Sequence, residues 1–141
     1  MVAGRPGPEP GAVGVAATAP STTPAGDRVP LRVLAGEWTG SYFCSQGETA
    51  LTLTLDPPDG AGSRAVFGFG PSPANPGIPI GAFEMGVGYL HNVLTFTQRR
   101  WITRPGDYLM VDLVADDVSP SHLSGRVTGP GCTIFQVTRR I

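Results

Sequence analysis

The chain has 141 residues, a formal net charge of −1 and only 15% charged residues. One domain is the expectation at this length, and the charge balance argues against a nucleic acid or a membrane surface as partner. No stretch approaches the roughly 18 consecutive apolar residues of a membrane-spanning helix, and the N-terminus lacks the apolar core of a signal peptide. We therefore expect a monomer that binds no nucleic acid and does not insert directly into a membrane.

Residues 1–30 are rich in proline, glycine and alanine and contain no aromatic side chain. Such a segment buries too little apolar surface to offset the entropy lost on ordering, so we predict a disordered tail or linker. It is either a flexible end without a role or a tether to a membrane or another domain. Residues 31–141 are predicted to form the single folded domain, and Leu31–Leu34 is expected to be a short turn or strand that leads into it.

Beyond this tail the sequence alternates with a period of two. Leu51, Leu53 and Leu55 are separated by Thr52 and Thr54, which is the pattern of a half-buried strand. No segment shows a capped helical period, so little or no long helix is expected. Turn-forming residues divide the alternating segments into eight predicted strands, at about residues 37–45, 49–56, 64–70, 80–89, 93–99, 107–114, 122–128 and 132–140.

Eight short strands joined by mostly tight links are typical of an antiparallel up-and-down meander. Such a meander can close on itself and so remove its exposed edges. We therefore predict an all-β fold, an antiparallel up-and-down eight-stranded β-barrel, with an open two-sheet β-sandwich as the alternative. The interior of an eight-stranded barrel is either just filled by side chains or holds one small ligand.

The chain contains two cysteines, Cys44 near the end of the first predicted strand and Cys132 at the start of the last. These strands are antiparallel neighbours in a closed barrel, so the two thiols are predicted to meet in a disulfide. The alternative is two separate thiols. A disulfide would stabilise the fold by roughly 4–5 kcal/mol on the chain-entropy model. It would indicate an extracytoplasmic location, either secreted or on the outer part of a larger anchored protein, whereas free thiols would be compatible with the cytoplasm.

Gly36 and Trp38 form a Gly-x-Trp motif on the first predicted strand, and Arg139 and Arg140 lie on the last. This arrangement resembles the calycin superfamily, which includes the lipocalins, fatty-acid-binding proteins and avidins. The resemblance implies that Trp38 closes one end of the barrel and that an arginine of the last strand packs over it. An indole is a large flat plug on which a guanidinium can stack. Extending the register from the cysteines sets Trp38 opposite Thr138.

The segment Leu34–Trp38, followed by a cysteine, also resembles the small bacterial barrel inhibitors of secreted metalloproteases. This resemblance implies inhibition through the N-terminal tail and a neighbouring loop. In those inhibitors the cysteines lie close together in sequence, whereas Cys44 and Cys132 are far apart.

Catalytic and metal-binding signatures are lacking. The two histidines, His91 and His122, lie at or beside predicted turns, and no Gly-x-Ser-x-Gly motif is present. The cysteines and histidines do not have the short spacing of metal ligands. We therefore predict that the chain is not an enzyme and uses no metal or other cofactor.

Glycines alternate with large side chains in two predicted strands. Phe67 and Phe69 alternate with Gly68 and Gly70, and residues 85–89 repeat the pattern. We expect the aromatic rings to fill the interior and the glycines to let the outer face curve. The alternative places the glycines inside, where they would leave a cavity.

The longest predicted link, residues 71–79, is one candidate for recognition. It contains Asn75 and Ile78 and is long for a hairpin. Loops of this kind on a rigid scaffold often carry binding residues. The alternative is a well-packed loop that covers one end of the barrel.

A second candidate surface combines arginines with an indole. Arg99, Arg100 and Arg104 flank Trp101 in the sequence, and guanidiniums beside an aromatic ring suit a carboxylate, a phosphate or an acidic partner. The alternative is an exposed strand end with Trp101 packed into the core.

Together these features predict a non-enzymatic binding or interaction module, a small lipocalin-like barrel on a flexible tether. Its partner is expected to be a protein or a small apolar molecule. The alternatives are a carrier that holds a small apolar ligand inside the barrel and a protease inhibitor of the bacterial small-barrel type.

Overall fold

The described part of the chain forms eight strands and one short helix. The structure is a computed structural model that describes residues 28–60 and 62–140. The elements are α1 (Leu31–Leu34), β1 (Gly36–Cys44), β2 (Gly47–Leu55), β3 (Ser63–Gly70), β4 (Gly81–Leu90), β5 (Val93–Thr103), β6 (Asp112–Val118), β7 (His122–Thr128) and β8 (Ile134–Arg139).

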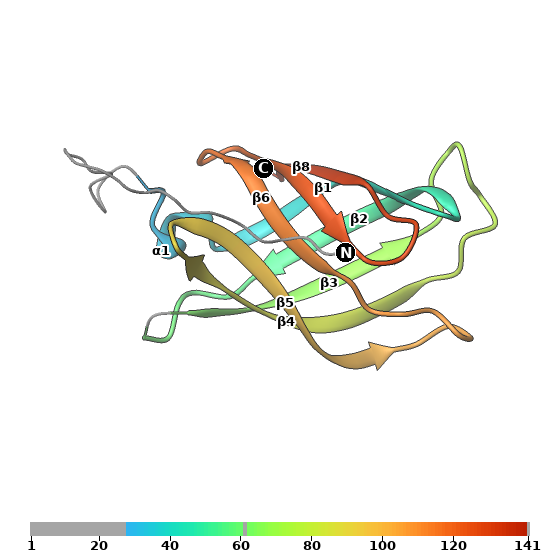
Figure 1. Ribbon diagram of the computed structural model, residues 1–141, viewed down its shortest axis with the longest axis horizontal. Helices are drawn as coiled ribbons and strands as arrows, with labels where there is room; N and C mark the ends of the chain where they lie inside the picture. The colour runs from blue at the N-terminus through green and yellow to red at the C-terminus, as the bar shows by residue number, and fades with distance from the viewer. Residues whose placement is uncertain (1–27, 61, 141) are drawn as a thin grey trace.

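Each strand pairs antiparallel with the next, and β8 pairs with β1, so the sheet closes into a barrel (Figure 1). The predicted fold class, strand order and closure are confirmed, and the open sandwich is excluded. Turn chemistry explains the tight links: His91 and Asn92, between β4 and β5, both have positive φ, as a two-residue hairpin turn often requires.

Most of the predicted tail, residues 1–27, lies outside the described residues. Its last residues contact the barrel. The Tyr89 hydroxyl donates to the carbonyl of Val29 at 2.7 Å, and the guanidinium of Arg28 lies 4.8 Å from the centre of the Tyr89 ring. The chain is therefore already fixed to the barrel before α1 begins.

Apolar side chains fill the interior of the barrel. Inward and outward positions alternate along the strands, as the pleat requires. Gly68 lies at the outward position between Phe67 and Phe69, and Gly86 and Gly88 lie at those on either side of Val87, as predicted. The largest fully buried side chains are Trp38, Phe67, Phe83, Phe96, Phe135, Leu34, Leu51, Leu53, Met85, Leu94, Leu113 and Leu123.

Two other glycines are needed because neighbouring strands approach closely. A Cβ on Gly40 of β1 would lie 1.9 Å from the carbonyl oxygen of Gln136 on β8, and one on Gly125 of β7 would lie 1.9 Å from that of Val114 on β6. No side chain fits at such a distance, so both positions require glycine.

One end of the barrel, the closed end, carries α1 and the β2–β3, β4–β5 and β6–β7 links (Figure 1, left). The indole of Trp38 is fully buried there and donates from Nε1 to the carbonyl of Leu34 at 2.9 Å. Leu31–Leu34 is a single helical turn rather than a strand, and its Leu34 side chain is buried in the same core cluster as Trp38.

The β1–β8 register differs by one residue from the predicted one. Trp38 lies opposite Arg139, not Thr138. Next to the cysteines, the N–H of Thr133 donates to the carbonyl of Phe43 at 2.9 Å, whereas the regular ladder pairs Phe135 with Tyr42. The ladder therefore shifts by one residue before β8 begins at Ile134, later than the predicted start at residue 132.

The opposite end, the mouth, carries the β1–β2, β3–β4, β5–β6 and β7–β8 links. The predicted disulfide joins Cys44 to Cys132 here, across a sequence separation of 88 residues. It fastens the end of β1 to the segment that leads into β8.

Strands β5 and β6 separate toward the mouth. Their ladder ends where Phe96 pairs with Leu113, and beyond it the N–H of Gln98 donates to the carboxylate of Asp112 at 2.8 Å instead of to a backbone carbonyl. The predicted strand over 107–114 is therefore wrong over residues 107–111, which form a turn and an unpaired segment. β5 extends past its predicted end at residue 99 because it continues to pair with β4 as far as Thr103.

Candidate functional site

The mouth of the barrel contains a pocket of about 460 Å³, which we call the mouth pocket. This volume lies within the roughly 300–1,000 Å³ typical of small-molecule sites. Its walls include the Cys44–Cys132 disulfide, Pro130 and side chains from the 107–111 segment. The pocket thus exists where β5 and β6 separate and the chain between them bends across the mouth.

The base of the mouth pocket is aromatic and consists of Tyr42, Phe67, Phe69, Phe83 and Tyr108. Phe67 stacks on Phe83 with ring centres 4.6 Å apart, and Tyr42 meets Phe67 edge-on at 5.1 Å. Phe69 stacks on Tyr108 at 5.4 Å. Because each ring is held by another, the base is preformed. Phe67 and Phe83 are only 0% and 1% exposed, so the apolar surface open to a ligand comes mainly from the half-buried Tyr108 and the exposed Leu109.

A few polar groups accompany this apolar base. Burial raises the pKa of Tyr42 well above its ordinary value of 10.0, the nearby Tyr108 phenol raises it further, and hydrogen bonds with Gln46 and Thr49 act in the opposite direction. The Tyr42 phenol therefore stays protonated and is able to donate. Gln46 and Asp107 also line the pocket, so a ligand with one polar end would find both donors and acceptors.

Exposed apolar side chains gather around the mouth. Five of the seven large apolar side chains that are exposed in the described residues lie at strand ends or links on this side, and they are between 37% and 73% exposed. They are Phe43, Ile80, Ile102, Leu109 and Ile134. Exposed apolar surface concentrated on one face is typical of a binding site.

The candidate loop residues Asn75 and Ile78 lie at the mouth but do not line the pocket. The Asn75 amide donates from Nδ2 to the carbonyl of Glu48 at 2.9 Å, and the Ser72 hydroxyl donates to the same carbonyl at 3.1 Å. Ile78 is half-buried and packs against the core. These contacts fasten the β3–β4 link to β2, which corresponds to the alternative of a packed loop.

Trp101 and Arg104 lie beside the base of the mouth pocket. The half-buried Trp101 ring meets Phe83 at 5.3 Å and Phe69 at 6.3 Å. The guanidinium of Arg104 lies 5.7 Å from the centre of the Trp101 ring and donates from Nε to the carbonyl of Tyr108 at 2.9 Å. The pair therefore supports the turn that places Tyr108 in the lining of the pocket.

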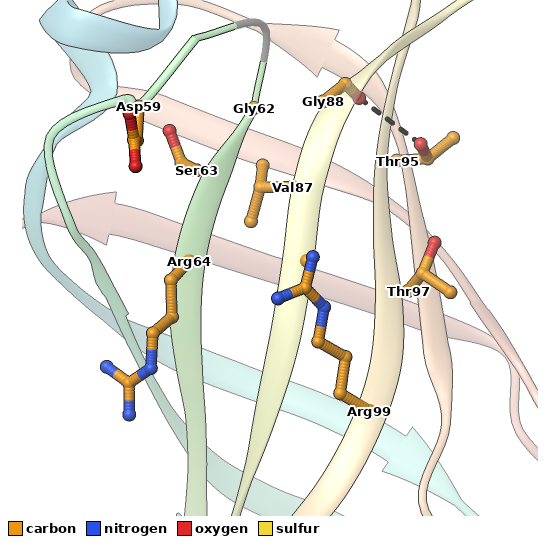
Figure 2. A pocket seen from close by; sticks show the side chains of 10 residues that line it. Asp59, Gly62, Ser63, Arg64, Val87, Gly88, Thr95, Thr97 and Arg99 are labelled. Carbon is orange, nitrogen blue, oxygen red and sulfur yellow. Dashed lines mark hydrogen bonds between the residues drawn. The ribbon is translucent and has the colours of Figure 1, made fainter.

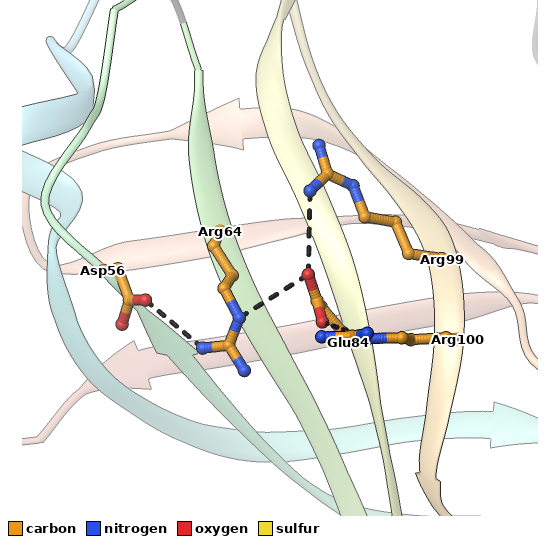
Figure 3. Close-up of polar contacts among 5 residues, drawn as sticks. All are labelled: Asp56, Arg64, Glu84, Arg99 and Arg100. Carbon is orange, nitrogen blue, oxygen red and sulfur yellow. Dashed lines mark hydrogen bonds and ion pairs between the residues drawn. The ribbon is translucent and has the colours of Figure 1, made fainter.

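Arg99 and Arg100 lie on the outer wall of the barrel, away from the pocket base. Figure 3 shows them with Arg64 around one carboxylate, that of Glu84, at 3.6, 2.8 and 3.5 Å respectively. A hydrogen bond from Arg100 lowers the pKa of Glu84 most, burial raises it, and the charges of the three arginines lower it further. The predicted surface of three arginines around Trp101 is thus divided between two places.

The motif residues lie together at the closed end. The guanidinium of Arg139 is 4.4 Å from the centre of the Trp38 ring. Gly36 has φ +129°, and a Cβ there would lie 2.9 Å from Nη1 of Arg139, so glycine leaves room for the guanidinium. Arg140 does not join them; its Nε lies 3.8 Å from the Glu37 carboxylate on the outer surface.

Sequence reasoning missed Tyr42, Gln46, Tyr108 and Leu109 as pocket residues. The alternation places Tyr42 on the inner face of β1, but it does not show that the barrel is open above it. Tyr108 was not recognised as a pocket residue because a strand was predicted across residues 107–114. An apolar stretch beside a turn has the same composition whether or not it pairs with a neighbouring strand.

The remaining candidates for chemistry are scattered. Within residues 28–60 and 62–140, no group of three or more His, Cys, Asp or Glu side chains is arranged to hold a metal ion. His91 occupies the exposed β4–β5 turn and His122 begins β7, so the two lie at different places on the closed end. The described residues also contain no helix that is long and apolar enough to cross a membrane.

Comparison with known proteins produced no match to a family model, to a curated protein or to a solved structure.

Proposed function

We propose that the chain is a non-catalytic binding module that takes the apolar part of a small molecule into the mouth pocket. The observation that carries this proposal is the aromatic base of a pocket of about 460 Å³ at the one barrel end that α1 does not cover. A rigid apolar surface with a few polar groups at its edge is the usual composition of a small-molecule site.

The filled interior decides where such a ligand would lie. Phe67, Phe83, Phe96 and Phe135 are buried along the barrel axis, and interiors packed in this way have few voids larger than a water molecule. The ligand of a carrier would therefore rest at the mouth rather than deep in the barrel. Its apolar part would face the rings, and its polar end would face Gln46, Asp107 or the Tyr42 hydroxyl.

The position of the closed end supports a calycin-type interpretation. Trp38 and Arg139 lie at the end opposite the mouth pocket, so a ligand would enter from the side that this pair leaves free. The protease-inhibitor alternative depends on the N-terminal tail, and residues 1–27 lie outside the described residues.

The disulfide supports an extracytoplasmic location. Disulfides persist in oxidising compartments and are rare in the cytosol. The Cys44–Cys132 bond also forms part of the pocket wall, so an oxidising compartment would preserve the shape of the proposed site.

A pair of matched leucines tests the proposal. Leu109 lines the mouth pocket and is 65% exposed, whereas Leu90 at the closed end is 59% exposed. The apolar dye anilinonaphthalene sulfonate should bind the native protein saturably, as measured by fluorescence titration and native mass spectrometry. Leu109→Ser should weaken this binding by roughly threefold to tenfold, because it removes apolar contact area.

Leu90→Ser is the control and should leave the dye affinity unchanged. Equal effects of the two substitutions would show that the dye only senses exposed apolar surface. Absence of saturable binding to the native protein would contradict a small apolar ligand at the mouth.

A further inference from the structure

The outer wall of the barrel carries a groove of about 520 Å³ across β3, β4 and β5. It lies on the closed-end half of these strands, apart from the mouth pocket. Figure 2 shows Arg64 rising from β3 and Arg99 from β5, with the Arg99 guanidinium lying over β4 between them. Gly86 and Gly88 form the floor there, so β4 contributes backbone rather than side chains.

A β-bulge places both Arg99 and Arg100 on this wall. Glu84 pairs with Arg100, but Met85 pairs with Gln98, so Arg99 is an extra residue in β5. A bulge of this kind changes the face to which a side chain points. Consecutive residues of a regular strand face opposite sides, whereas Arg99 and Arg100 are both exposed and both reach the same carboxylate.

Glu84 holds the guanidiniums in place without neutralising them. Its side chain is only 9% exposed beneath Arg64, Arg99 and Arg100, and Arg64 also contacts Asp56 at 3.3 Å. Three positive and two negative groups meet here (Figure 3). Asp59 in the groove adds a third carboxylate, so a ligand would be attracted by the N–H groups of Arg99 that its ion pair does not use and not by a net charge. Side chains fixed in advance lose less entropy when they bind a ligand.

The absence of a side chain at Gly86 is what lets Arg99 occupy the groove. A Cβ on Gly86 would lie 2.7 Å from Nη2 and 2.8 Å from Nε of Arg99. A hydroxyl group completes the lining, since Thr97 lies beside Arg99 on the outer face. The hydroxyl of Ser63 is instead buried on the inner face of β3 and has no hydrogen-bond partner within the described part of the chain.

We propose that this groove binds a tetrahedral oxyanion, a phosphate or sulfate group, at the Nε and Nη2 edge of Arg99, since its Nη1 is the atom that contacts Glu84. The forked N–H groups of arginine match the oxygens of such anions in pairs, and the Thr97 hydroxyl supplies a further donor. Asp59 lines the groove as well. Its negative charge would repel an anion and so restrict it to the side of the groove where Arg99 lies. The group is either a free anion or a monoester on a small molecule. This site is independent of the proposed function of the mouth.

The test is a titration of the full chain at low ionic strength with inorganic phosphate, inorganic sulfate and a sugar monophosphate. Binding is measured from the NMR chemical shifts of the Gly86 and Gly88 amides. At least one probe should bind saturably. Arg99→Gln should weaken binding about tenfold, the loss expected for charge-assisted hydrogen bonds. The matched control is Arg126→Gln, which removes the same charge from a pair with Asp116 elsewhere on the barrel and should change the affinity less than about twofold.

Gly86→Ala preserves every charge but displaces the Arg99 guanidinium, so it should also weaken binding. Its control is Gly68→Ala, where an added Cβ would lie 3.7 Å from its nearest neighbour, an ordinary contact. Equal affinity for free phosphate and the monoester indicates the free anion as ligand, and tighter binding of the monoester indicates a larger molecule. Absence of saturable shifts with all three probes would overturn the proposal, as would equal losses in the Arg99 and Arg126 variants.

Discussion

Each end of the barrel has a tryptophan with an arginine over its ring. At the closed end, Trp38 is fully buried, and Arg139, 4.4 Å from the ring centre, donates to three backbone carbonyls. At the mouth, Trp101 is half-buried, and Arg104, 5.7 Å from the ring centre, donates to one carbonyl.

The difference lies in how many donors each guanidinium keeps after its structural contacts. A guanidinium has five N–H donors in a fixed fork. Arg139 uses its donors to join α1 and the β6–β7 link to β8, which leaves little capacity for a ligand. Arg104 orients one turn and keeps most of its donors in solvent, beside a pocket with an aromatic base. The guanidinium of Arg139 therefore serves mainly to anchor the chain at the closed end. The guanidinium of Arg104 keeps N–H donors available at the mouth.

The largest expected difference between the ends comes from removing each indole. Trp38→Ala should lower the free energy of unfolding by about 3–5 kcal/mol, because it empties a fully enclosed site. Trp101→Ala should cost about 1–2 kcal/mol, since water can occupy the space left by a half-buried ring. Urea unfolding followed by circular dichroism measures both.

The dye titration described above separates stability from binding in the same variants. Trp101→Ala should weaken binding at the mouth pocket, because Trp101 packs against Phe69 and Phe83 in its base. Equal losses of stability in the two variants would remove the distinction between an anchoring end and a binding end.

The fold could be predicted from the sequence because its determinants are local or few. Period-two alternation and turn residues define eight strands, and the two cysteines identify the first and last strands as neighbours. The register was predicted one residue off because it was extended from Cys132 through Thr133, where the ladder is irregular. A disulfide fixes where two segments meet. It does not require that the strands that continue from the two cysteines, here β1 and β8, keep the register set by the cysteine pair.

The candidate sites were harder to predict because both depend on departures from a regular sheet. The mouth pocket exists because β5 and β6 separate beyond Phe96, and the arginine cluster beside the outer groove depends on a bulge that places Arg99 and Arg100 on the same face. A prediction from period-two alternation assumes an unbroken ladder of backbone hydrogen bonds. It therefore assigns the wrong face of the sheet to residues that follow a bulge. Arg99 and Trp101 are close in sequence but belong to different surfaces for this reason.

A smaller difference is expected from the two arginines. Arg139→Gln should lower the free energy of unfolding by about 1.5–3 kcal/mol, because it removes charge-assisted hydrogen bonds to carbonyls at the closed end. Arg104→Gln should change it by less than about 0.5 kcal/mol, as expected for an exposed side chain. Chemical denaturation of both variants at one ionic strength provides the comparison, and a larger loss for Arg104→Gln would contradict the assignment of the anchoring role to the closed end.

The smallest expected effect concerns acid, and it should arise from the wall between the two ends. Neither indole titrates and arginine stays protonated, so both Trp–Arg pairs should be insensitive to acid. Glu84 differs because its pKa in the folded protein lies below the ordinary 4.5. Near pH 4.5 the unfolded chain then binds more protons than the folded one. The stabilisation that the Glu84 carboxylate provides is therefore complete above pH 4.5 and is lost as the pH falls through the lowered pKa.

Glu84→Gln removes this titration while keeping the shape of the side chain. The melting temperature of the native protein should exceed that of the variant at about pH 6, and the gap should shrink by about pH 3, where Glu84 is increasingly protonated. Trp38→Ala provides the reference, because its deficit relative to the native protein should stay nearly constant over the same range. A Glu84→Gln gap that does not change with pH would show that the carboxylate is not preferentially stabilised by its three arginines. The rigid arrangement proposed for the outer groove would then lose its physical basis, whereas the contrast between the closed end and the mouth would be unaffected.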